Sequence, residues 1–600
     1  MPANMTDSSR LNAATRESSL AHMRSQVLDV LVIGGGIVGA GSALDAVTRG
    51  LDVGILEAQD WASGTSSRSS KLVHGGIRYL EQLDFPLVQE ALTERGLLLQ
   101  RLAPHLVRPI RFLYPLHHRV WERFYIGVGM MLYDLLSYTG GRTPGVPHHR
   151  HLSKRQVALA APSLRSSNII GGLSYYDGQV DDARYVVTLV RTAASFGAHA
   201  ANRVRVEGFL TEGERIVGVK AHDLLTDEHF EIRAKTVINS TGVWTGETQA
   251  MVSDGGRLRV RASKGVHILI PRAKFQSVMG LLLRTEKSVL FVIPWGKHWI
   301  IGTTDTDWHL DKAHPSATAA DIDYILDHVN TVMETPLTRD DIEGVYVGLR
   351  PLLAGESDET SKLSREHVVA NPTPGLVLIA GGKWTTYRVM AHDAVDAAVE
   401  GLTSLRNVDS QNQDPRDQDS RDWNPFDGPI PASVTDRVPL LGASGYAAEF
   451  NRRDRIAATA GIPLSLVTHL LHRYGSMAHD VLALIAEDAS LATLLPGTTD
   501  YIEAEVVYAA THEGALHVED VLDRRTRLSI ETADRGAAAA PVVAKILATK
   551  LSWNARRVQA EITNYRAMVE AELASQRQHD DEAANALSIA IPPIGQATTS

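Results

Sequence analysis

Three glycines and one acid within residues 28–57 have the spacing of a dinucleotide-binding site. Gly34, Gly36 and Gly39 follow the apolar run VLVI in G-x-G-x-x-G spacing, and a helical pattern and a second apolar run lead to Glu57. Gly34 permits a tight turn, Gly36 leaves room for a pyrophosphate, and Gly39 brings the helix close to the strand. The helix N-terminus attracts phosphate, and Glu57 can accept hydrogen bonds from ribose hydroxyls. The sequence therefore predicts a dinucleotide-binding βαβ unit.

The next segment, WASGTSSRSSKLVHGGIRYLEQLDF (61–85), is rich in small hydroxyl residues, glycines and basic residues. Its hydroxyls can bind phosphate oxygens, and its glycines allow an aromatic ring to approach the backbone. A flexible Ser/Gly linker is the alternative. Lys, His and Arg are denser here than a linker needs, so we interpret the segment as part of a functional site.

Buried strands ending in small residues occur twice more along the chain. AKTVINSTGVW (234–244) and LVLIAGGKWTTYR (376–388) both read as a strand followed by a turn, and the second also opens a helix. Because the carboxyl ends of parallel strands meet at one edge of a sheet, these turns can converge on one ligand. Residues 258–366 show alternating apolar runs that predict a mixed sheet forming a second wall.

These patterns predict an α/β protein with a Rossmann-like domain, a mixed β-sheet domain and a helical C-terminal domain. The Rossmann-like domain is expected in three pieces, 28–82, 152–257 and 367–401, and the second domain in two, 83–151 and 258–366. Residues 402–433 are polar and acidic and are predicted to be a linker before a helical domain at 434–575. Residues 1–27 are predicted to be a disordered extension, and 576–600 a mobile tail.

Composition narrows the classes of function. The 600 residues are 44% apolar and 22% charged, which is typical of a folded chain of several domains. A net charge of −10 argues against general nucleic-acid binding. The absence of cysteine excludes disulfides, thiolate catalysis and cysteine-ligated clusters. The polar start of the chain does not resemble a secretory signal, and no apolar run is long enough to predict a membrane-spanning helix.

Residues 101–155 depart from this overall acidity. They contain nine Arg or Lys residues, opposed only by Glu122 and Asp134, around the apolar segment FYIGVGMMLYDLL (124–136). Such a segment suits an interfacial helix on anionic lipid, and a core helix with solvated basic loops fits equally well. The histidines of this stretch lack the spacing of metal ligands, so no metal site is predicted.

Longer motifs give the chain a family resemblance. It resembles the flavin-dependent glycerol-3-phosphate dehydrogenases within the wider D-amino-acid-oxidase-like flavoproteins. The resemblance rests on VLVIGGGIVGAG, LEAQDWASGTSSRSSKLVHGGIRYLEQLDFPLVQEAL, VDDARYV, SKGVHILIP, VLFVIPW, IIGTTDTD, VGLRPLL and AGGKWTTYR, in the family's order from Val30 to Arg388. The helical C-terminal region matches more loosely.

The resemblance implies FAD as cofactor and assigns residues to it. Glu57 would bind the ribose. Thr65, Ser66, Ser70, Leu72 and His74 would line the pyrophosphate and the ring. Gly381, Gly382, Lys383 and Thr385 would meet the isoalloxazine edge, where a helix N-terminus stabilises an anionic reduced flavin.

The resemblance also implies oxidation of sn-glycerol 3-phosphate to dihydroxyacetone phosphate. Phosphate recognition would fall to Arg78, Arg350 and Arg365, with Lys383 and Tyr79 as supporting donors. His267 is the first choice for the base that takes the C2 hydroxyl proton, and Arg350 would polarise the developing carbonyl. A core histidine in a sheet is the alternative for His267, and residues 303–305 are expected to brace the sheet rather than react.

The implied electron acceptor is a membrane quinone, with peripheral attachment to the cytoplasmic face of the plasma membrane and a possible homodimer. An oxidase passing electrons to oxygen fits the same motifs. An amino-acid or 2-hydroxy-acid oxidase fits less well because arginine is abundant, and a catalytically silent flavoprotein fits less well because the arginines and the candidate base are all present. An NAD(P)-dependent dehydrogenase is a further possibility, which flavin absorbance of the purified protein would exclude.

Overall fold

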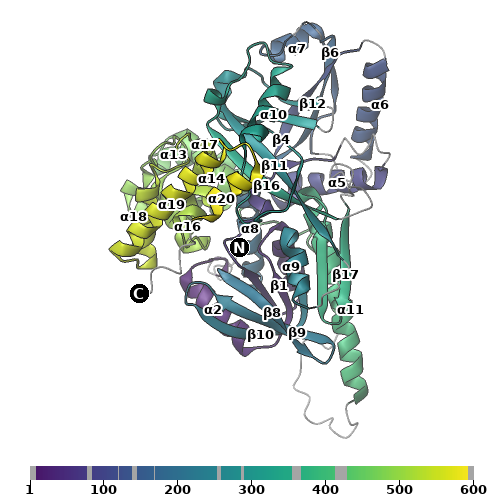
Figure 1. Cartoon of the computed structure of the whole chain (residues 1–600), viewed down its shortest axis with the longest axis vertical. Helices are drawn as coiled ribbons and strands as arrows, with labels where there is room; N and C mark the ends of the chain where they lie inside the picture. The colour runs from purple at the N-terminus through teal and green to yellow at the C-terminus, as the bar shows by residue number, and fades with distance from the viewer. Residues whose placement is uncertain are drawn as a thin grey trace.

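Two sheets and a helical domain make up the molecule (Figure 1). The structure, a computed structural model, describes residues 8–76, 84–118, 121–137, 145–165, 167, 169–252, 258–284, 289–353, 366–412 and 429–591. The first sheet lies in the lower half of Figure 1, the second above it, and the C-terminal helices pack beside both. This arrangement confirms the predicted fold class.

The first sheet has the strand order β17–β18–β10–β1–β2–β7, with β8 and β9 extending from β10 as an antiparallel meander. Its central pairs are parallel, and β17 is an antiparallel edge strand. The strands are β1 (Leu28–Ile33), β2 (Val53–Glu57), β7 (His199–Asn202), β8 (Val204–Glu212), β9 (Arg215–Asp223), β10 (Glu228–Asn239), β17 (His367–Thr373) and β18 (Leu376–Gly381).

Both faces of this sheet are covered, which explains why β1 and β2 are almost continuously apolar. Helices α3 (Ile37–Thr48), α8 (Asp182–Ser195) and α11 (Tyr387–Asn412) share the apolar core on one face. The meander and α2 (Ala13–Ser25) bury the other. A short helix, α9 (Thr245–Ala250), follows the end of β10.

The second sheet has the order β15–β11–β14–β13–β12–β4–β6–β3, with β16 beside β11 and β5 beside β6. Its strands are β3 (Leu72–Val73), β4 (Val107–Leu116), β5 (Arg150–Ser153), β6 (Gly171–Val180), β11 (Val260–Pro271), β12 (Gly280–Arg284), β13 (Val289–Trp295), β14 (His298–Gly302), β15 (Thr306–Trp308) and β16 (Gly344–Leu353). Helices α5 (Phe85–Leu97), α6 (Trp121–Leu136), α7 (Lys154–Ala160) and α10 (Ala319–Asn330) surround it.

Successive side chains of β11 point alternately toward α10 and toward the opposite face of the sheet. Val266 and Ile268 belong to the core that includes α10. Because successive side chains of a strand point to opposite faces, His267 between them lies on the other face.

The C-terminal domain consists of short helices around its own apolar clusters. They are α12 (Tyr446–Asn451), α13 (Arg453–Ala460), α14 (Leu464–Tyr474), α15 (Ala478–Glu487), α16 (Glu503–His512), α17 (Leu528–Glu531), α18 (Ala540–Leu551), α19 (Ala555–Ser575) and α20 (Asp581–Ile589), with the π-helix η11 (Asp520–Arg525) between α16 and α17.

The prediction of a disordered N-terminal extension is wrong for residues 8–27. Asn12 caps α2 by accepting a hydrogen bond from the Thr15 N–H at 3.0 Å, and Leu20 and Met23 are buried against the sheet. Leu11, just before α2, contacts the C-terminal domain, because its N–H donates to His512 O at 3.0 Å. Leu20 and Met23 lie on one face of α2 and pack the helix against the sheet. The polar average composition of residues 1–27 gave no indication of this packing.

Three further boundaries need correction. The tail predicted from residue 576 contains α20, in which Asp581 pairs with Lys264 of β11. The linker predicted from residue 402 begins later, because α11 continues to Asn412; residues 413–428 lie outside the described chain. Residues 152–180, predicted in the cofactor domain, contribute β6 to the second sheet, since β6 pairs with β4 before the chain enters α8.

Candidate active site

The glycine turn after β1 has the shape of a pyrophosphate cradle. Gly34 has φ +106°, and a Cβ on Gly39 would lie 1.9 Å from Gly34 O, so both positions require glycine for the turn itself. A Cβ on Gly36 would meet only the Ser66 side chain, at 3.1 Å to Oγ. Gly36 therefore keeps an approach to the backbone open at the N-terminus of α3, where an anion is stabilised.

Glu57 ends β2 beside this turn. Its carboxylate accepts hydrogen bonds from the N–H groups of Gly35 and Gln59, both at 2.7 Å. Burial raises the pKa of Glu57, and these two backbone bonds act against the rise. A carboxylate has about four acceptor positions, so capacity remains for ribose hydroxyls.

The segment after β2 joins the cradle to the second sheet. Ser66 Oγ accepts from the Ile37 N–H at 2.9 Å and so caps α3, while Thr65 Oγ1 donates to Leu349 O of β16 at 2.6 Å. Ser70 Oγ forms a hydrogen bond with His267 Nε2 at 2.8 Å. The predicted hydroxyl residues thus connect the cofactor side to the sheet that carries the candidate base.

The glycine turn after β18 meets the same segment. Gly381 and Gly382 have φ +80° and +77°, and Lys383 follows directly before the short turn η7 (Trp384–Thr386). Thr385 Oγ1 accepts from the His74 N–H at 3.2 Å. Leu72 is buried in β3, two residues before His74. The structure therefore brings together the predicted cofactor residues of both glycine turns.

His267 is almost fully buried, at 2% exposure, on the face of β11 opposite α10. Its ring stacks on Tyr346 of β16, with centroids 4.6 Å apart and planes within 7°. Burial lowers the pKa of His267 well below its usual value, and the charges of Arg350 and Lys71 lower it further. The imidazole is therefore neutral near pH 7, which is the form a proton acceptor needs.

Arg350 lies on the same face, because it pairs with Ser263 in the register that pairs Tyr346 with His267. Its guanidinium donates to Thr303 Oγ1 at 3.0 Å, Thr304 O at 3.1 Å and Ser263 Oγ at 3.3 Å. Residues 303–305 thus brace the sheet as expected, and their oxygens also fix the direction of Arg350, which the sequence did not indicate.

Three predicted substrate residues, Arg78, Tyr79 and Arg365, lie outside the described chain. Their role as a phosphate clamp stays a prediction. Lys383 remains at the turn after β18, next to Gly382.

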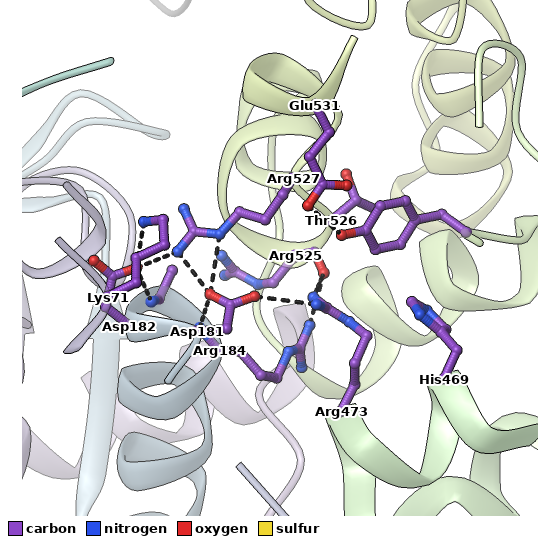
Figure 2. A network of polar contacts seen from close by, with 12 residues as sticks. Lys71, Asp181, Asp182, Arg184, His469, Arg473, Arg525, Thr526, Arg527 and Glu531 are labelled. Carbon is purple, nitrogen blue, oxygen red and sulfur yellow. Dashed lines mark hydrogen bonds and ion pairs between the residues drawn. The ribbon is translucent and has the colours of Figure 1, made fainter. Parts of the chain in front are cut away.

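Sequence reasoning missed a buried ionic network next to the site (Figure 2). Lys71 Nζ lies 2.9 Å from Asp182 Oδ1, and Arg527 of the C-terminal domain pairs with both Asp181 and Asp182. The acidic pair in VDDARYV and the run RRTR at 524–527 were the available signals. They could not be connected, because 345 positions separate Asp182 from Arg527.

The residues present fit FAD. Gly36 leaves an approach for a pyrophosphate, Glu57 retains acceptor capacity for a ribose, and two positive-φ glycines precede a helix start at the other end of the site. These features lie along the carboxyl edge of the first sheet, where dinucleotides bind in such folds.

Comparisons with known proteins agree with this geometry. Residues 29–388 match the family described as FAD dependent oxidoreductase, and residues 433–558 match the C-terminal domain of alpha-glycerophosphate oxidase. The chain is 52% identical to glycerol-3-phosphate dehydrogenase 2 of Mycobacterium tuberculosis, over 97% of this chain and 95% of that protein. It is 35% identical to the mitochondrial glycerol-3-phosphate dehydrogenase of Bos taurus, over 92% of this chain and 74% of that protein.

A solved structure extends the likeness to three dimensions. The glycerol-3-phosphate dehydrogenase of Bacillus halodurans, crystallised with FAD, superposes with a TM-score of 0.73 at 30% identity, covering 94% of this chain and 97% of that one. Together with the cradle and the paired sheets, these matches show that the chain belongs to the FAD-dependent oxidoreductases and, within them, to the glycerol-3-phosphate dehydrogenase family.

Proposed function

We propose that the protein oxidises sn-glycerol 3-phosphate to dihydroxyacetone phosphate and delivers the electrons to a membrane quinone. The observation that carries the proposal is that His267 and Arg350 lie on the same face of one sheet, and that Ser70 links His267 to the segment beside the glycine turn. The named activity of the similar dehydrogenases supports the choice of substrate.

His267 would take the proton of the C2 hydroxyl. The ring is buried, and its Nε2 is 2.8 Å from the half-buried Ser70 Oγ, so the hydroxyl of Ser70 offers a path for the proton into the ring. Stacking on Tyr346 fixes the plane of the imidazole. When bound, FAD supplies the acceptor for the C2 hydride and the route of its two electrons to the quinone.

Arg350 would stabilise negative charge on the C2 oxygen as the carbonyl forms. Its guanidinium is held by neutral oxygens of Thr303, Thr304 and Ser263, with Asp305 Oδ1 at 3.5 Å, so its direction is set before the reaction. Fixed charge of this kind needs no reorganisation during the reaction. Arg78, Tyr79, Arg365 and Lys383 would bind the phosphate.

Anaerobic titration of the purified protein with glycerol 3-phosphate tests the proposal. We expect the visible flavin absorbance to bleach with a stoichiometric amount of substrate, and not with glycine or lactate. Mixing the reduced protein with a soluble quinone or with oxygen then separates the dehydrogenase from the oxidase. Bleaching by an amino acid or a 2-hydroxy acid instead would overturn the assigned substrate.

We also propose that α6 attaches the protein to the inner face of the plasma membrane. Within the described part of the chain, no helix combines the length and the apolar character needed to cross a bilayer. Helix α6 instead lies on the outside of the second sheet, away from the C-terminal domain (Figure 1). It exposes apolar side chains at helical spacing, namely Phe124 (73%), Tyr125 (53%), Val128 (44%), Met131 (60%) and Leu135 (62%).

Charge near α6 favours anionic lipid as the partner of this face. Gly127 of α6 lies against His151 of β5, and the neighbouring Arg150, Lys154 and Arg155 are exposed. Exposed apolar groups beside basic residues are the features of an interfacial helix. A second copy of the chain is the alternative occupant.

Vesicle co-sedimentation tests the attachment. We expect binding to vesicles containing anionic lipid. Met131→Glu with Leu135→Glu should weaken this binding at least about tenfold, because charged groups replace apolar side chains that would enter the bilayer. Leu464→Glu with Leu494→Glu, at two exposed apolar positions of the C-terminal domain, is the matched control. Equal binding by both variants would contradict the role of α6, and a change from dimer to monomer in light scattering would assign the face to a second copy.

A further inference from the structure

Tyr346 stands between the candidate base and a buried lysine. Its ring stacks on His267 at 4.6 Å, and Lys71 Nζ lies 4.7 Å from the centroid of the same ring. Lys71 is fully buried, and its backbone has φ +58°, a left-handed conformation that is strained for a residue with a side chain. The surroundings must therefore hold Lys71 in place.

Asp182 provides that hold. Its Oδ1 pairs with Lys71 Nζ at 2.9 Å, and its Oδ2 accepts from both the N–H and the hydroxyl of Ser69, at 2.9 and 2.7 Å. Tyr346 OH donates to Ser69 O at 2.9 Å. Ser70, between the two residues that Asp182 binds, is the hydrogen-bond partner of His267. One carboxylate thus fixes both contacts of the imidazole.

The C-terminal domain completes this arrangement through Arg527, which pairs with Asp182 and with Asp181 at 2.6 Å (Figure 2). Arg527 also donates to Ser67 O at 3.3 Å, the same oxygen that accepts from Lys71 Nζ at 3.1 Å. A buried carboxylate needs such partners, because an unpaired charge in the interior is costly. The position of the segment 67–71 therefore depends on the C-terminal domain.

We propose that Lys71 is a positioning residue for His267, and that the C-terminal domain takes part in this positioning through Arg527 and Asp182. The inference rests on the proposed role of His267 as the base. It gives a function to Asp181 and Asp182 of the VDDARYV motif, and to the attachment of the C-terminal domain to the cofactor domain.

The positive charge of Lys71 lowers the pKa of His267. Among described residues, the charged groups that act on the imidazole are Arg350 from β16 and Lys71 from the segment before β3, and both disfavour the imidazolium. Burial lowers the pKa of Lys71 to about 8, and Arg527 lowers it while Asp182 raises it, so the amine is charged at pH 7. Removing this charge should let His267 accept a proton at higher pH.

Titration of the His267 ring is the direct test, using NMR of protein labelled at histidine Cε1, with the resonance identified by its loss in His267→Asn. In Lys71→Gln we expect the midpoint to rise by at least about half a pH unit, while Lys71→Arg keeps the wild-type value. In anaerobic stopped-flow, the pH at which the flavin reduction rate falls to half of its plateau should rise by the same amount in Lys71→Gln.

Arg527→Gln tests the contribution of the C-terminal domain, and Arg473→Gln is its matched control. Arg473 pairs with Asp181 at 3.0 Å in the same interface but contacts neither Asp182 nor Lys71 in the described chain. We expect the titration midpoint of His267 to rise in Arg527→Gln and to return part of the way to the wild-type value in Arg527→Lys. Arg473→Gln should lose a similar amount of thermal stability but leave this midpoint unchanged.

Two results would overturn the inference. One is an unchanged His267 midpoint in a folded, FAD-loaded Lys71→Gln protein. The other is an equal shift in the Arg527→Gln and Arg473→Gln proteins, which would reduce the effect to general loosening of the interface. A shifted midpoint in a protein that glycerol 3-phosphate never reduces would instead refute the proposed function and leave the positioning intact.

Discussion

Arg350 is oriented by the oxygens of Ser263 in β11 and of Thr303 and Thr304 between β14 and β15, so its guanidinium needs little rearrangement to meet a developing negative charge. His267 is equally constrained, by Ser70 on one side and by the Tyr346 ring. At this scale the site combines a neutral imidazole with a fixed guanidinium, which would suit the proposed removal of a hydroxyl proton as a carbonyl forms.

Arg350→Ala should lower kcat/KM for glycerol 3-phosphate at least about 100-fold, which corresponds to a loss of about 3 kcal/mol of transition-state stabilisation. The physical reason is the loss of a fixed positive charge beside the C2 oxygen. Steady-state kinetics measures the effect. Arg339→Ala, which removes an exposed arginine paired with Asp323, is the control and should be near wild type. Turnover of Arg350→Ala within threefold of wild type would refute the role.

Glu57→Gln should weaken FAD binding about tenfold, or about 1.4 kcal/mol. The amide keeps the shape of the side chain but loses the charged acceptor for ribose hydroxyls and for the N–H groups of Gly35 and Gln59. Fluorescence titration of the apoprotein with FAD gives the affinity, and Glu212→Gln at an exposed position serves for comparison. Unchanged affinity would place the ribose elsewhere.

At the scale of elements, the glycine spacing predicted β1, α3 and β2 correctly because local geometry alone demands that pattern. The N-terminal α2 and the C-terminal α20 were not predicted, since each depends on contacts with distant strands rather than on its own composition. The domain to which β6 belongs was also predicted wrongly. Its sequence is compatible with either sheet, and only its pairing with β4 places it in the second sheet.

The π-helix η11 carries a carboxyl group, that of Asp523, whose ionisation should lower the stability of the fold. Burial raises the pKa of Asp523 to about 6, above its model-compound value of 3.8, so between these values the folded protein binds a proton that the unfolded chain does not. Stability therefore falls as the pH rises through this range. Asp523→Asn should stabilise the protein at pH 8 by on the order of 1 kcal/mol, with the gain disappearing near pH 4.

Denaturant unfolding at several pH values measures this difference. Asp534 provides a control of opposite sign, because backbone N–H groups of Gly536 and Ala538 hold its pKa below the usual value although burial acts to raise it. Asp534→Asn should destabilise at pH 8, with the loss diminishing toward acid pH. A pH-independent effect of Asp523→Asn would contradict the argument.

At the scale of the whole molecule, buried ion pairs rather than apolar contacts alone join the C-terminal domain to the cofactor domain. Asp60, three residues after Glu57, accepts from Arg524 Nε at 2.5 Å and from Arg525 at 2.6 and 2.7 Å. The sequence contains the acid and the arginines, but it does not predict that they form ion pairs. Asp60 and Arg524 are 464 positions apart, and such a distant pair leaves no local pattern. The candidate base and Arg350 were found only because they stand in recognisable motifs.

Asp60→Asn should destabilise the protein by about 3–5 kcal/mol, because two buried guanidinium groups lose a charged partner. We expect a lower thermal midpoint together with weaker FAD retention, since the same loop carries Glu57. Differential scanning calorimetry and flavin content give the two readings. Asp323→Asn, which breaks an exposed pair, should change neither. Loss of stability without loss of flavin would show that the interface and the cradle are independent.

Asn12 and Thr511 lie 499 positions apart, yet the side-chain amide of Asn12 donates to the backbone carbonyl of Thr511 at 3.4 Å. Beside this contact, the backbone of Leu11 is hydrogen-bonded to His512 and Gly514. A ribosome must therefore synthesise most of the chain before the first segment finds its partner. Helix α2 can already dock on β1 and β2 through Leu20 and Met23, so the contacts of Leu11 and Asn12 are expected to form late, once the C-terminal domain has been synthesised.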